Sequence, residues 1–294
     1  MSNWPRCGLY AGGLILTALV ACSRSPEPGS GPPQRIVSLT PSATEMVAAV
    51  GATDRLVGVD EFSTYPPEVA DLPRAGDFVH PSFEAIIELR PDLVVLDRVQ
   101  DELDAVLRAS GIRTLMLDVH AIADVRAGVL AVGDAVGEPG RAQEVVAQID
   151  ADIEATAARG RSRAARVRVV AIIDRTPGQL GHMVAVGPGA WLDELLAITG
   201  AANALADAGR AYINIGAEEI MRAAPDVILE TARPGHERLR ADWRDLPEVP
   251  AVAAGRVHAL IDPIYAAPTP RVGTALRGLE ELLHGDAAHG MRAP

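Results

Sequence analysis

Two glutamates occupy matching places in a block of sequence that the chain repeats. The first copy starts at Pro81 and reads PSFEAIIELRPDLVVLD; the second starts at Gly216 and reads GAEEIMRAAPDVILET. An offset of 134 residues places Glu84 on Glu218 and aligns the Pro-Asp pair of each copy. Each glutamate falls in the first turn of a predicted helix, where the helix dipole favours a carboxylate by about 0.3 to 1 kcal/mol. The repeat therefore predicts two similar structural units, each with an acidic residue near a helix start.

Aromatic side chains are the second group that could bind a partner or ligand. Phe78 and Tyr212 each lie six residues before one of the repeated glutamates, so we expect both to face a cleft between the two units. Aromatic rings supply a large apolar contact at low entropy cost, which suits a flat or macrocyclic ligand. For Phe62 and Tyr65 the alternative is that they pack against the turn before Pro66 and Pro67. Eight aromatic residues follow residue 22: Phe62, Tyr65, Phe78, Phe83, Trp191, Tyr212, Trp243 and Tyr265.

The sequence contains no short-range catalytic or metal-binding motif. Its seven histidines show neither HxH nor HExxH spacing, and no serine sits in a GxSxG elbow. The glycine-rich run GHMVAVGPGAW lacks the order of a nucleotide-binding loop, and we interpret it as a turn before a helix at Trp191. We therefore expect no enzyme activity, no resident metal and no cofactor. One alternative stays open, in which His80 or Tyr212 ligates the iron of a bound haem.

The amino-terminal residues read as a leader and a tether. GLYAGGLILTALVAC is an uncharged apolar run that follows Arg6, has signal-peptide length and is short for a membrane span. The only cysteines are Cys7, inside the segment expected to be removed, and Cys22 at its boundary, so the chain after Cys22 has no thiol for a disulfide or a thiolate metal site. The following SRSPEPGSGPPQ is rich in Pro, Gly and Ser and predicts a flexible tether.

The rest of the chain alternates between strand and helix patterns, which predicts an α/β fold with mostly parallel strands. RIVSL, LVGVD, PDLVVLD and TLMLDV are the first strand candidates, and each is apolar along its whole length, as expected for strands covered on both faces. From Ile122 to about Arg161 the pattern stays helical apart from GEPG. Alternation then resumes with VRVVAIID, PDVILE and RVHALI as strands. The prediction is two Rossmann-like lobes, residues 35–121 and 164–294, joined through a helical segment at 122–163 that contains one long rigid helix.

This order of elements and three local segments resemble a known transport family. The segments are RIVSLTPSATEMVAAVGATDRLVGVD, STYPPEVADLPRAGDFVHPSFEAIIELRPDLVV and DPIYAAPTPR. They are similar to the substrate-binding lipoproteins of ABC importers in the cobalamin and ferric-siderophore class, most closely to its cobalamin-binding members. LVAC, from Leu19 to Cys22, resembles the lipobox of bacterial lipoproteins. The resemblance implies a signal peptide at 1–21, a lipidated Cys22 with a tether to residue 34, and a class III binding-protein fold of the helical-backbone type.

The same resemblance implies roles for individual residues. Glu84 and Glu218 match the surface glutamates that dock these proteins on the permease, with Glu219 as the competitor of Glu218. A matched pair of exposed carboxylates can position a basic partner at two points. In place of two aromatic residues of the cobalamin-binding members this chain has Asp97 and Asp174. The positions that match the ligand cleft are Phe62, Phe78, Asp97, Asp174, Tyr212 and Tyr265.

These observations together predict an extracytoplasmic solute-binding lipoprotein. We expect it to capture cobalamin as a monomer, to be held to a bacterial membrane by its lipid alone, and to deliver the ligand to an ABC permease and ATPase complex. The formal net charge of −12 argues against nucleic acid as a partner, because a phosphate-binding surface needs a basic excess. The alternatives are a ferric-siderophore or haem carrier of the same class and, from another class, an extracytoplasmic lipoprotein enzyme.

Overall fold

The computed structural model describes Met1, residues 31–232 and residues 239–285. The predicted signal peptide, the predicted lipidation site Cys22 and most of the predicted tether lie outside these residues. From Pro32 onward the described residues belong to one compact unit. Within the described part of the chain, no helix is long and apolar enough to cross a membrane.

The first lobe is built on a four-stranded parallel sheet in the order β2-β1-β3-β4. Strands β1, β2 and β3 are nearly all buried, whereas the edge strand β4 is only partly buried. Thr40 accepts a hydrogen bond from the Ala43 backbone at the start of α1, and Ser82 caps α2 in the same way. The elements are β1 (Ile36–Ser38), α1 (Pro41–Ala49), β2 (Leu56–Val59), α2 (Phe83–Glu88), β3 (Leu93–Asp97), α3 (Asp101–Ala109), β4 (Arg113–Leu117) and the 3-10 helices Thr53–Arg55, Pro67–Val69 and Arg98–Gln100.

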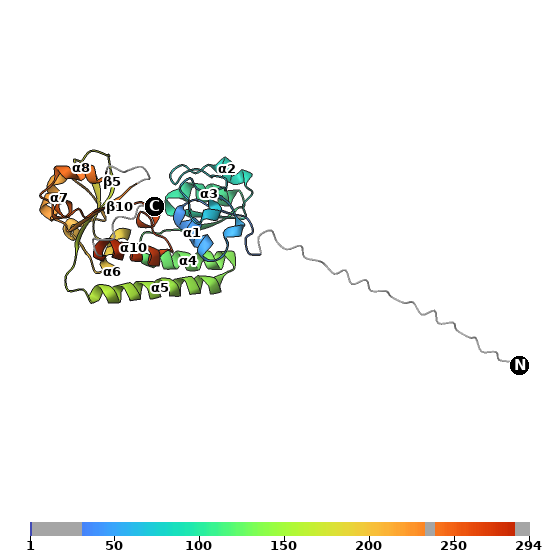
Figure 1. Cartoon of the computed structure of the whole chain (residues 1–294). Coiled ribbons are helices and arrows are strands. Elements are labelled where there is room, and N and C mark those ends of the chain that lie inside the picture. The colour runs from blue at the N-terminus through green and yellow to red at the C-terminus, as the bar shows by residue number, and fades with distance from the viewer. Residues whose placement is uncertain (2–30, 233–238, 286–294) are drawn as a thin grey trace. The chain divides into compact units, whose positions relative to one another are not determined.

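Two successive helices connect the lobes, α4 (Ile122–Val136) and α5 (Pro139–Arg161). Gly137 ends α4 in the left-handed region at φ 80°, and Pro139 opens α5, so the predicted interruption at GEPG is confirmed. With 23 residues, α5 is about 35 Å long at 1.5 Å per residue. It runs beneath both lobes, packed on α4 in its first half and on α10 in its second (Figure 1).

The second lobe contains a mixed sheet in the order β10-β9-β5-β6-β8, with β7 added beside β5. Strands β10, β9 and β5 are parallel, whereas β6 and β8 are antiparallel to their neighbours. The interpretation of GHMVAVGPGAW as a turn was therefore wrong for its first half, which forms β6. The elements are β5 (Arg168–Arg175), β6 (Met183–Val186), α6 (Trp191–Ile198), β7 (Ala202–Asn203), β8 (Tyr212–Ile215), α7 (Ala217–Ala223), β9 (Val227–Thr231), α8 (Leu239–Asp242), α9 (Pro250–Ala253), β10 (Val257–Leu260), α10 (Val272–His284) and the 3-10 helices Ala206–Ala208, Trp243–Asp245 and Pro263–Tyr265.

The sequence repeat is also a repeat of hydrogen bonds. Asp92 accepts from the backbone nitrogen of Arg35 at 3.0 Å, and Asp226 accepts from that of Arg168 at 2.8 Å. The same two arginines donate to carbonyls at the ends of the two helices, that of Leu89 just after α2 and that of Ala223, the last residue of α7. In each lobe, these hydrogen bonds thus connect the start of the central strand to the end of the helix that carries the repeated glutamate. The repeated block does not reveal the two arginines, because they lie far from it in the sequence.

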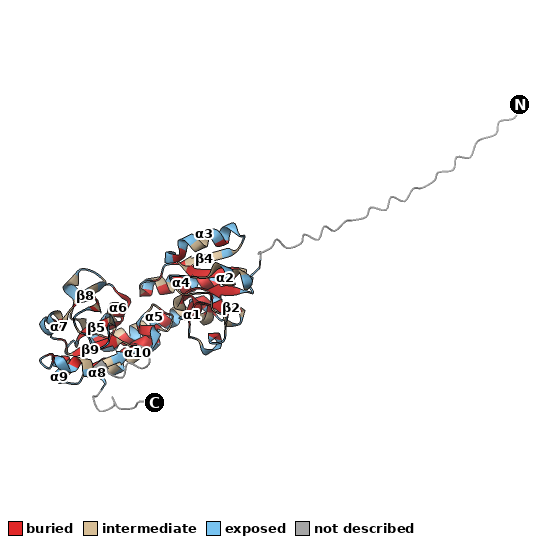
Figure 2. Ribbon diagram, turned by 90° about the horizontal axis from the view of Figure 1, so that it is seen from above, coloured by how far each residue is buried: buried red, intermediate tan, exposed pale blue. Residues whose placement is uncertain are grey.

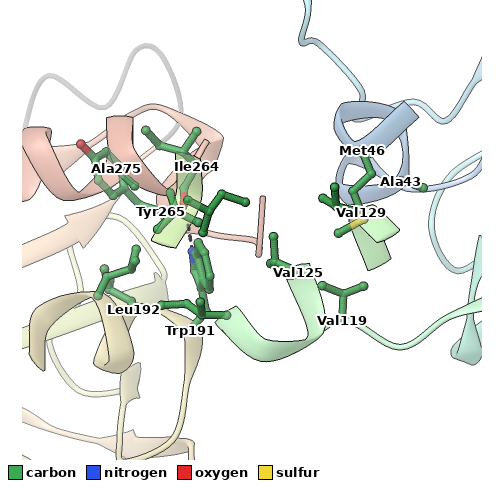
Figure 3. Close-up of a cluster of buried hydrophobic side chains, with 14 of the residues drawn as sticks. Ala43, Met46, Val119, Val125, Val129, Trp191, Leu192, Ile264, Tyr265 and Ala275 are labelled. Carbon is green, nitrogen blue, oxygen red and sulfur yellow. Dashed lines mark hydrogen bonds between the residues drawn. The ribbon is translucent and has the colours of Figure 1, made fainter. Parts of the chain in front are cut away.

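A single buried apolar cluster spans the two lobes. It joins Met46 of α1 and Val129 of α4 to Trp191 of α6 and Ile264 beyond β10, and Trp191 donates a hydrogen bond to the Ile264 carbonyl at 3.0 Å (Figure 3). Figure 2 shows that buried residues concentrate along the strands of both lobes. Because the cluster continues from lobe to lobe, it adds to α5 as a restraint on their relative motion.

Candidate functional site

A cavity of about 820 Å³ lies between the lobes. Its walls are the segments that follow the carboxyl ends of β1, β2, β3 and β4 in one lobe and of β9 and β10 in the other, which is where open α/β sheets bind ligands. The first lobe contributes Thr40, Pro41, Ser42, Glu45, Glu61, Phe62, Thr64, Phe78, Asp97, Val99, Val119 and His120. The second contributes Ala232, Leu260, Ile261, Asp262, Pro263, Ala266, Ala267, Pro268 and Thr269.

The Phe62 loop is held from below by a buried polar chain. Asp60 is fully buried and accepts hydrogen bonds from the Phe62 nitrogen at 2.9 Å and from the Ser63 hydroxyl. Burial raises the pKa of Asp60 above its ordinary value although these bonds oppose the shift. The Ser63 hydroxyl lies 2.7 Å from that of Thr44. These bonds fix the loop, while residue Phe62 stays 57 % exposed at the cavity.

Asp97, at the end of β3, is tied to the neighbouring Phe78 segment through Gln100. The Gln100 amide accepts from the Asp97 nitrogen at 3.0 Å and donates to the Phe78 carbonyl at 3.0 Å. The Asp97 carboxylate caps the following turn by accepting from Val99 at 3.1 Å. Burial raises the pKa of Asp97, and the nearby Asp118 carboxylate adds to that rise.

Charged residues of one sign dominate the lining. Its carboxylates are Glu45, Glu61, Asp97 and Asp262, while no arginine or lysine is among the described lining residues. Among the lining residues that the structure describes, His120 is the one whose side chain carries nitrogen, and its Nε2 lies 2.8 Å from Asp118 Oδ1. Among the described residues no group of three His, Cys, Asp or Glu side chains is placed to hold a metal ion.

A clasp crosses from lobe to lobe at one wall of the cavity; we define it as Glu45, Tyr65, Thr269 and Arg271. Arg271 binds Glu45 in bidentate fashion, with Nη2–Oε1 2.7 Å and Nε–Oε2 2.9 Å, and Thr269 donates to the same carboxylate. The Arg271 guanidinium also lies 4.0 Å from the centroid of the Tyr65 ring. Burial lowers the pKa of Arg271, but the hydrogen bonds and charge of Glu45 outweigh it and leave the pKa above its ordinary value.

Three of the six predicted ligand residues line the cavity and three do not. Phe62, Phe78 and Asp97 are lining residues. Asp174 is exposed near the end of β5, outside the lining. Tyr265 is buried in the apolar core, although its neighbours Pro263 and Ala266 reach the cavity.

Tyr212 differs from Phe78 despite the matching sequence position. It begins β8 and pairs with Val186 of β6, half exposed on an edge strand that has no counterpart in the first lobe. Burial of its other half raises the pKa of Tyr212. Of the two aromatic residues expected to face the cleft, Phe78 lines the cavity and Tyr212 is not among its lining residues. His80, named with Tyr212 as a possible iron ligand, is also outside the lining and lies against Asp77.

The repeated glutamates are exposed at equivalent helix starts. Glu84 lies in the first turn of α2 and Glu218 in that of α7. Glu219 accepts a hydrogen bond from the Gly216 backbone at 2.9 Å, which lowers its pKa and commits it to capping α7. Of the two neighbouring glutamates, Glu218 is therefore the one whose carboxylate is available to a partner.

Comparisons with known proteins agree on one family. The family model described as periplasmic binding protein matches residues 36–263. The chain is 28 % identical to the ABC transporter substrate-binding lipoprotein YvrC of Bacillus subtilis over 85 % of this chain and 79 % of that protein. The heme-binding protein RhuT of Roseiflexus sp. RS-1 superimposes with a TM-score of 0.76 at 29 % identity, covering 85 % of this chain and 98 % of RhuT. The vitamin B12-binding protein BtuF of Vibrio cholerae superimposes with a TM-score of 0.72 at 26 % identity, covering 86 % and 97 %.

Proposed function

Because the chain belongs to the periplasmic binding protein family, a family of solute-binding proteins of ABC importers and not of enzymes, we propose that its cargo is a corrinoid held in the cavity between the lobes. The predicted α/β fold of the class III type is confirmed by the same comparison. The cavity wall supports the choice of ligand, and the exposed glutamates support the choice of partner.

The composition of the cavity wall carries the corrinoid proposal. At about 820 Å³ the cavity is near the upper end of the roughly 300 to 1,000 Å³ typical of small-molecule sites. Its wall combines the Phe62 and Phe78 rings with aliphatic residues and carboxylates, without an arginine or lysine among the described lining residues. A ferric siderophore with several anionic groups would meet the like-charged Glu61 and Asp97, since Glu45 and Asp262 are both paired with Arg271. A corrin ring rimmed by neutral amides would find apolar faces and hydrogen-bond acceptors.

Haem is the second candidate, and His120 is the observation that favours it. An imidazole at the wall could ligate iron, and the similar protein RhuT is a heme-binding protein. Haem nevertheless carries two propionates, for which the described lining offers no basic partner. We therefore place the corrinoid, whose rim is neutral, before haem as the proposed ligand.

Ligand retention tests the proposal. The chain from Ser23 onward is incubated separately with cyanocobalamin, haem and a ferric hydroxamate, desalted, and its visible spectrum is recorded. We expect the protein fraction to keep the corrinoid bands at one equivalent. Retention of haem or the ferric hydroxamate without retention of cyanocobalamin would overturn the corrinoid assignment.

Docking on the permease is assigned to Glu84 and Glu218. Both carboxylates are exposed at equivalent helix starts, a geometry that suits two-point recognition by basic pockets. Replacing both by Ala should abolish corrinoid uptake in cells while leaving the affinity of the purified protein unchanged. Glu88→Ala, an exposed glutamate at the other end of α2, is the matched control. Normal uptake by the double variant would exclude this docking role.

The remaining proposals concern location and assembly. We assign the lipid anchor to Cys22. We also propose that the protein acts as a monomer outside the cytoplasm. Cys22→Ser should move the protein from the membrane fraction to the soluble fraction. Unchanged fractionation would show that another segment anchors the chain.

A further inference from the structure

His120 occupies a distinctive place in the cavity. It follows β4 by three residues, its side chain is 76 % exposed, and it contributes to the wall beside Asp97. Every other lining side chain described by the structure is aliphatic, aromatic or oxygen-bearing. His120 is therefore the single nitrogen ligand that this wall offers to a bound metal centre.

The imidazole is oriented by a carboxylate. Its Nε2 lies 2.8 Å from Asp118 Oδ1, and Asp118 in turn lies 3.8 Å from Arg98 Nε. A neutral imidazole that donates from Nε2 keeps its lone pair on Nδ1. Nδ1 makes no hydrogen bond within the described part of the chain. A histidine whose second nitrogen donates to a carboxylate has the usual arrangement of a metal ligand, because the carboxylate fixes the tautomer and the orientation of the ring.

The opposite wall offers no second nitrogen ligand among its described residues. The second lobe presents Leu260, Ile261 and Pro263 together with small residues, and its polar lining groups are the Asp262 carboxylate and the Thr269 hydroxyl. A flat macrocycle between these walls would meet a nitrogen ligand on one face and an apolar surface on the other.

We propose that His120 is an axial ligand to the metal of the transported macrocycle and that Asp118 positions it. The inference rests on the proposed function and narrows its ligand class to metallo-macrocycles with one axial position that is open or easily vacated. Cobinamide, which lacks the lower nucleotide base, meets this requirement directly. A complete cobalamin has an open axial position once its own nucleotide base is displaced from the cobalt, and haem offers an axial position on its iron.

Electron paramagnetic resonance of bound Co(II) cobinamide tests the ligation. One axial nitrogen splits the cobalt lines into triplets, and labelling the protein with 15N-histidine converts the triplets to doublets. We expect both patterns from the wild-type protein. His120→Ala should lose the nitrogen splitting and bind cobinamide at least about tenfold more weakly, and Asp118→Asn should keep the splitting with about tenfold weaker binding. His80→Ala, an exposed histidine outside the lining, should change neither quantity.

The outcomes separate the two levels of the proposal. Cobinamide retained by the wild-type protein without nitrogen splitting, or splitting that persists in His120→Ala, would overturn the ligation and leave the proposed function standing. Failure of the wild-type protein to retain cobinamide, cyanocobalamin and haem would overturn both. Haem titrations give a parallel readout, since loss of a histidine ligand shifts the Soret band in His120→Ala but not in His80→Ala.

Discussion

Replacing Arg271 by Met measures how strongly the clasp holds the two lobes together. Glu45 is only 7 % exposed and Arg271 17 %, so the variant leaves a buried carboxylate without its ionic partner. Removing one member of a buried pair costs about 3 to 5 kcal/mol. Because Thr269 still donates to Glu45, we expect the lower end, about 3 kcal/mol.

A double-mutant cycle isolates the contribution of the pair. Glu45→Gln keeps the shape and the hydrogen-bonding capacity but removes the charge, and should cost about 1.5 kcal/mol. The double variant Glu45→Gln with Arg271→Met should then be little worse than Arg271→Met alone, which corresponds to a coupling of about 1 to 1.5 kcal/mol.

Urea unfolding at pH 7, followed by circular dichroism, provides the four free energies of unfolding. A single transition with an unchanged slope is required for the comparison. A coupling below about 0.5 kcal/mol would refute the account of the clasp, because residues that do not interact give additive effects within that margin.

Other predictions concern pH and helix packing. Burial raises the pKa of Asp97 in the folded state. The contribution of Asp97 to stability therefore falls as the pH rises from its unfolded-state pKa to its folded-state pKa. Asp97→Asn should unfold at a higher urea concentration than the wild-type protein at pH 7 but not at pH 3. The hydrogen bond and charge of Arg159 lower the pKa of Glu280. The stabilisation from Glu280 is therefore present above its unfolded-state pKa and is lost as the pH falls through its folded-state pKa. Glu280→Gln should be less stable than the wild-type protein at pH 7, and this difference in unfolding free energy should shrink in acid; a difference that is constant with pH would contradict the pairing. A Cβ on Gly160 of α5 would lie 2.9 Å from backbone atoms at the end of α6, so Gly160→Ala should lower the free energy of unfolding in urea by about 1 to 3 kcal/mol. Gly140→Ala, at the start of α5 where a Cβ meets no atom within 4 Å, is the control and should cost nothing. Equal stabilities of the two variants would contradict this packing.

The regular elements of the fold were predictable because their sequence patterns are local. The apolar runs of β1, β3 and β9 and the break between α4 and α5 all depend on neighbouring residues, and the structure confirms them. Strands β6 and β8 escaped prediction. They are four residues each and pair antiparallel with one another, and β6 lies in a glycine-rich run that resembles a turn.

The cavity was predictable only in part, because most of its wall is formed by segments that are distant in the sequence and are brought together by the order of the strands. Phe62, Phe78 and Asp97 could be found from aromatic content and resemblance, whereas His120 carried no motif. The signal that could have found His120 is its position just after a strand, since parallel strands bring their carboxyl ends to one edge. The match of Tyr212 with Phe78 is one of sequence position only, because the repeat holds for α7 and β9 but not for the strand β8 that precedes them.

Titration of cyanocobalamin into a variant with a blocked cavity tests the central claim most directly. Ala266 is exposed and lines the cavity, so Ala266→Trp places a large ring where the ligand is proposed to lie. Ala253→Trp makes the same substitution at an exposed position of α9, outside the lining, and serves as the control. Calorimetry should give one site per chain for the wild-type and control proteins, and at least about a hundredfold loss of affinity for Ala266→Trp with unchanged circular dichroism. Equal affinity in all three proteins would place the ligand elsewhere and contradict the account.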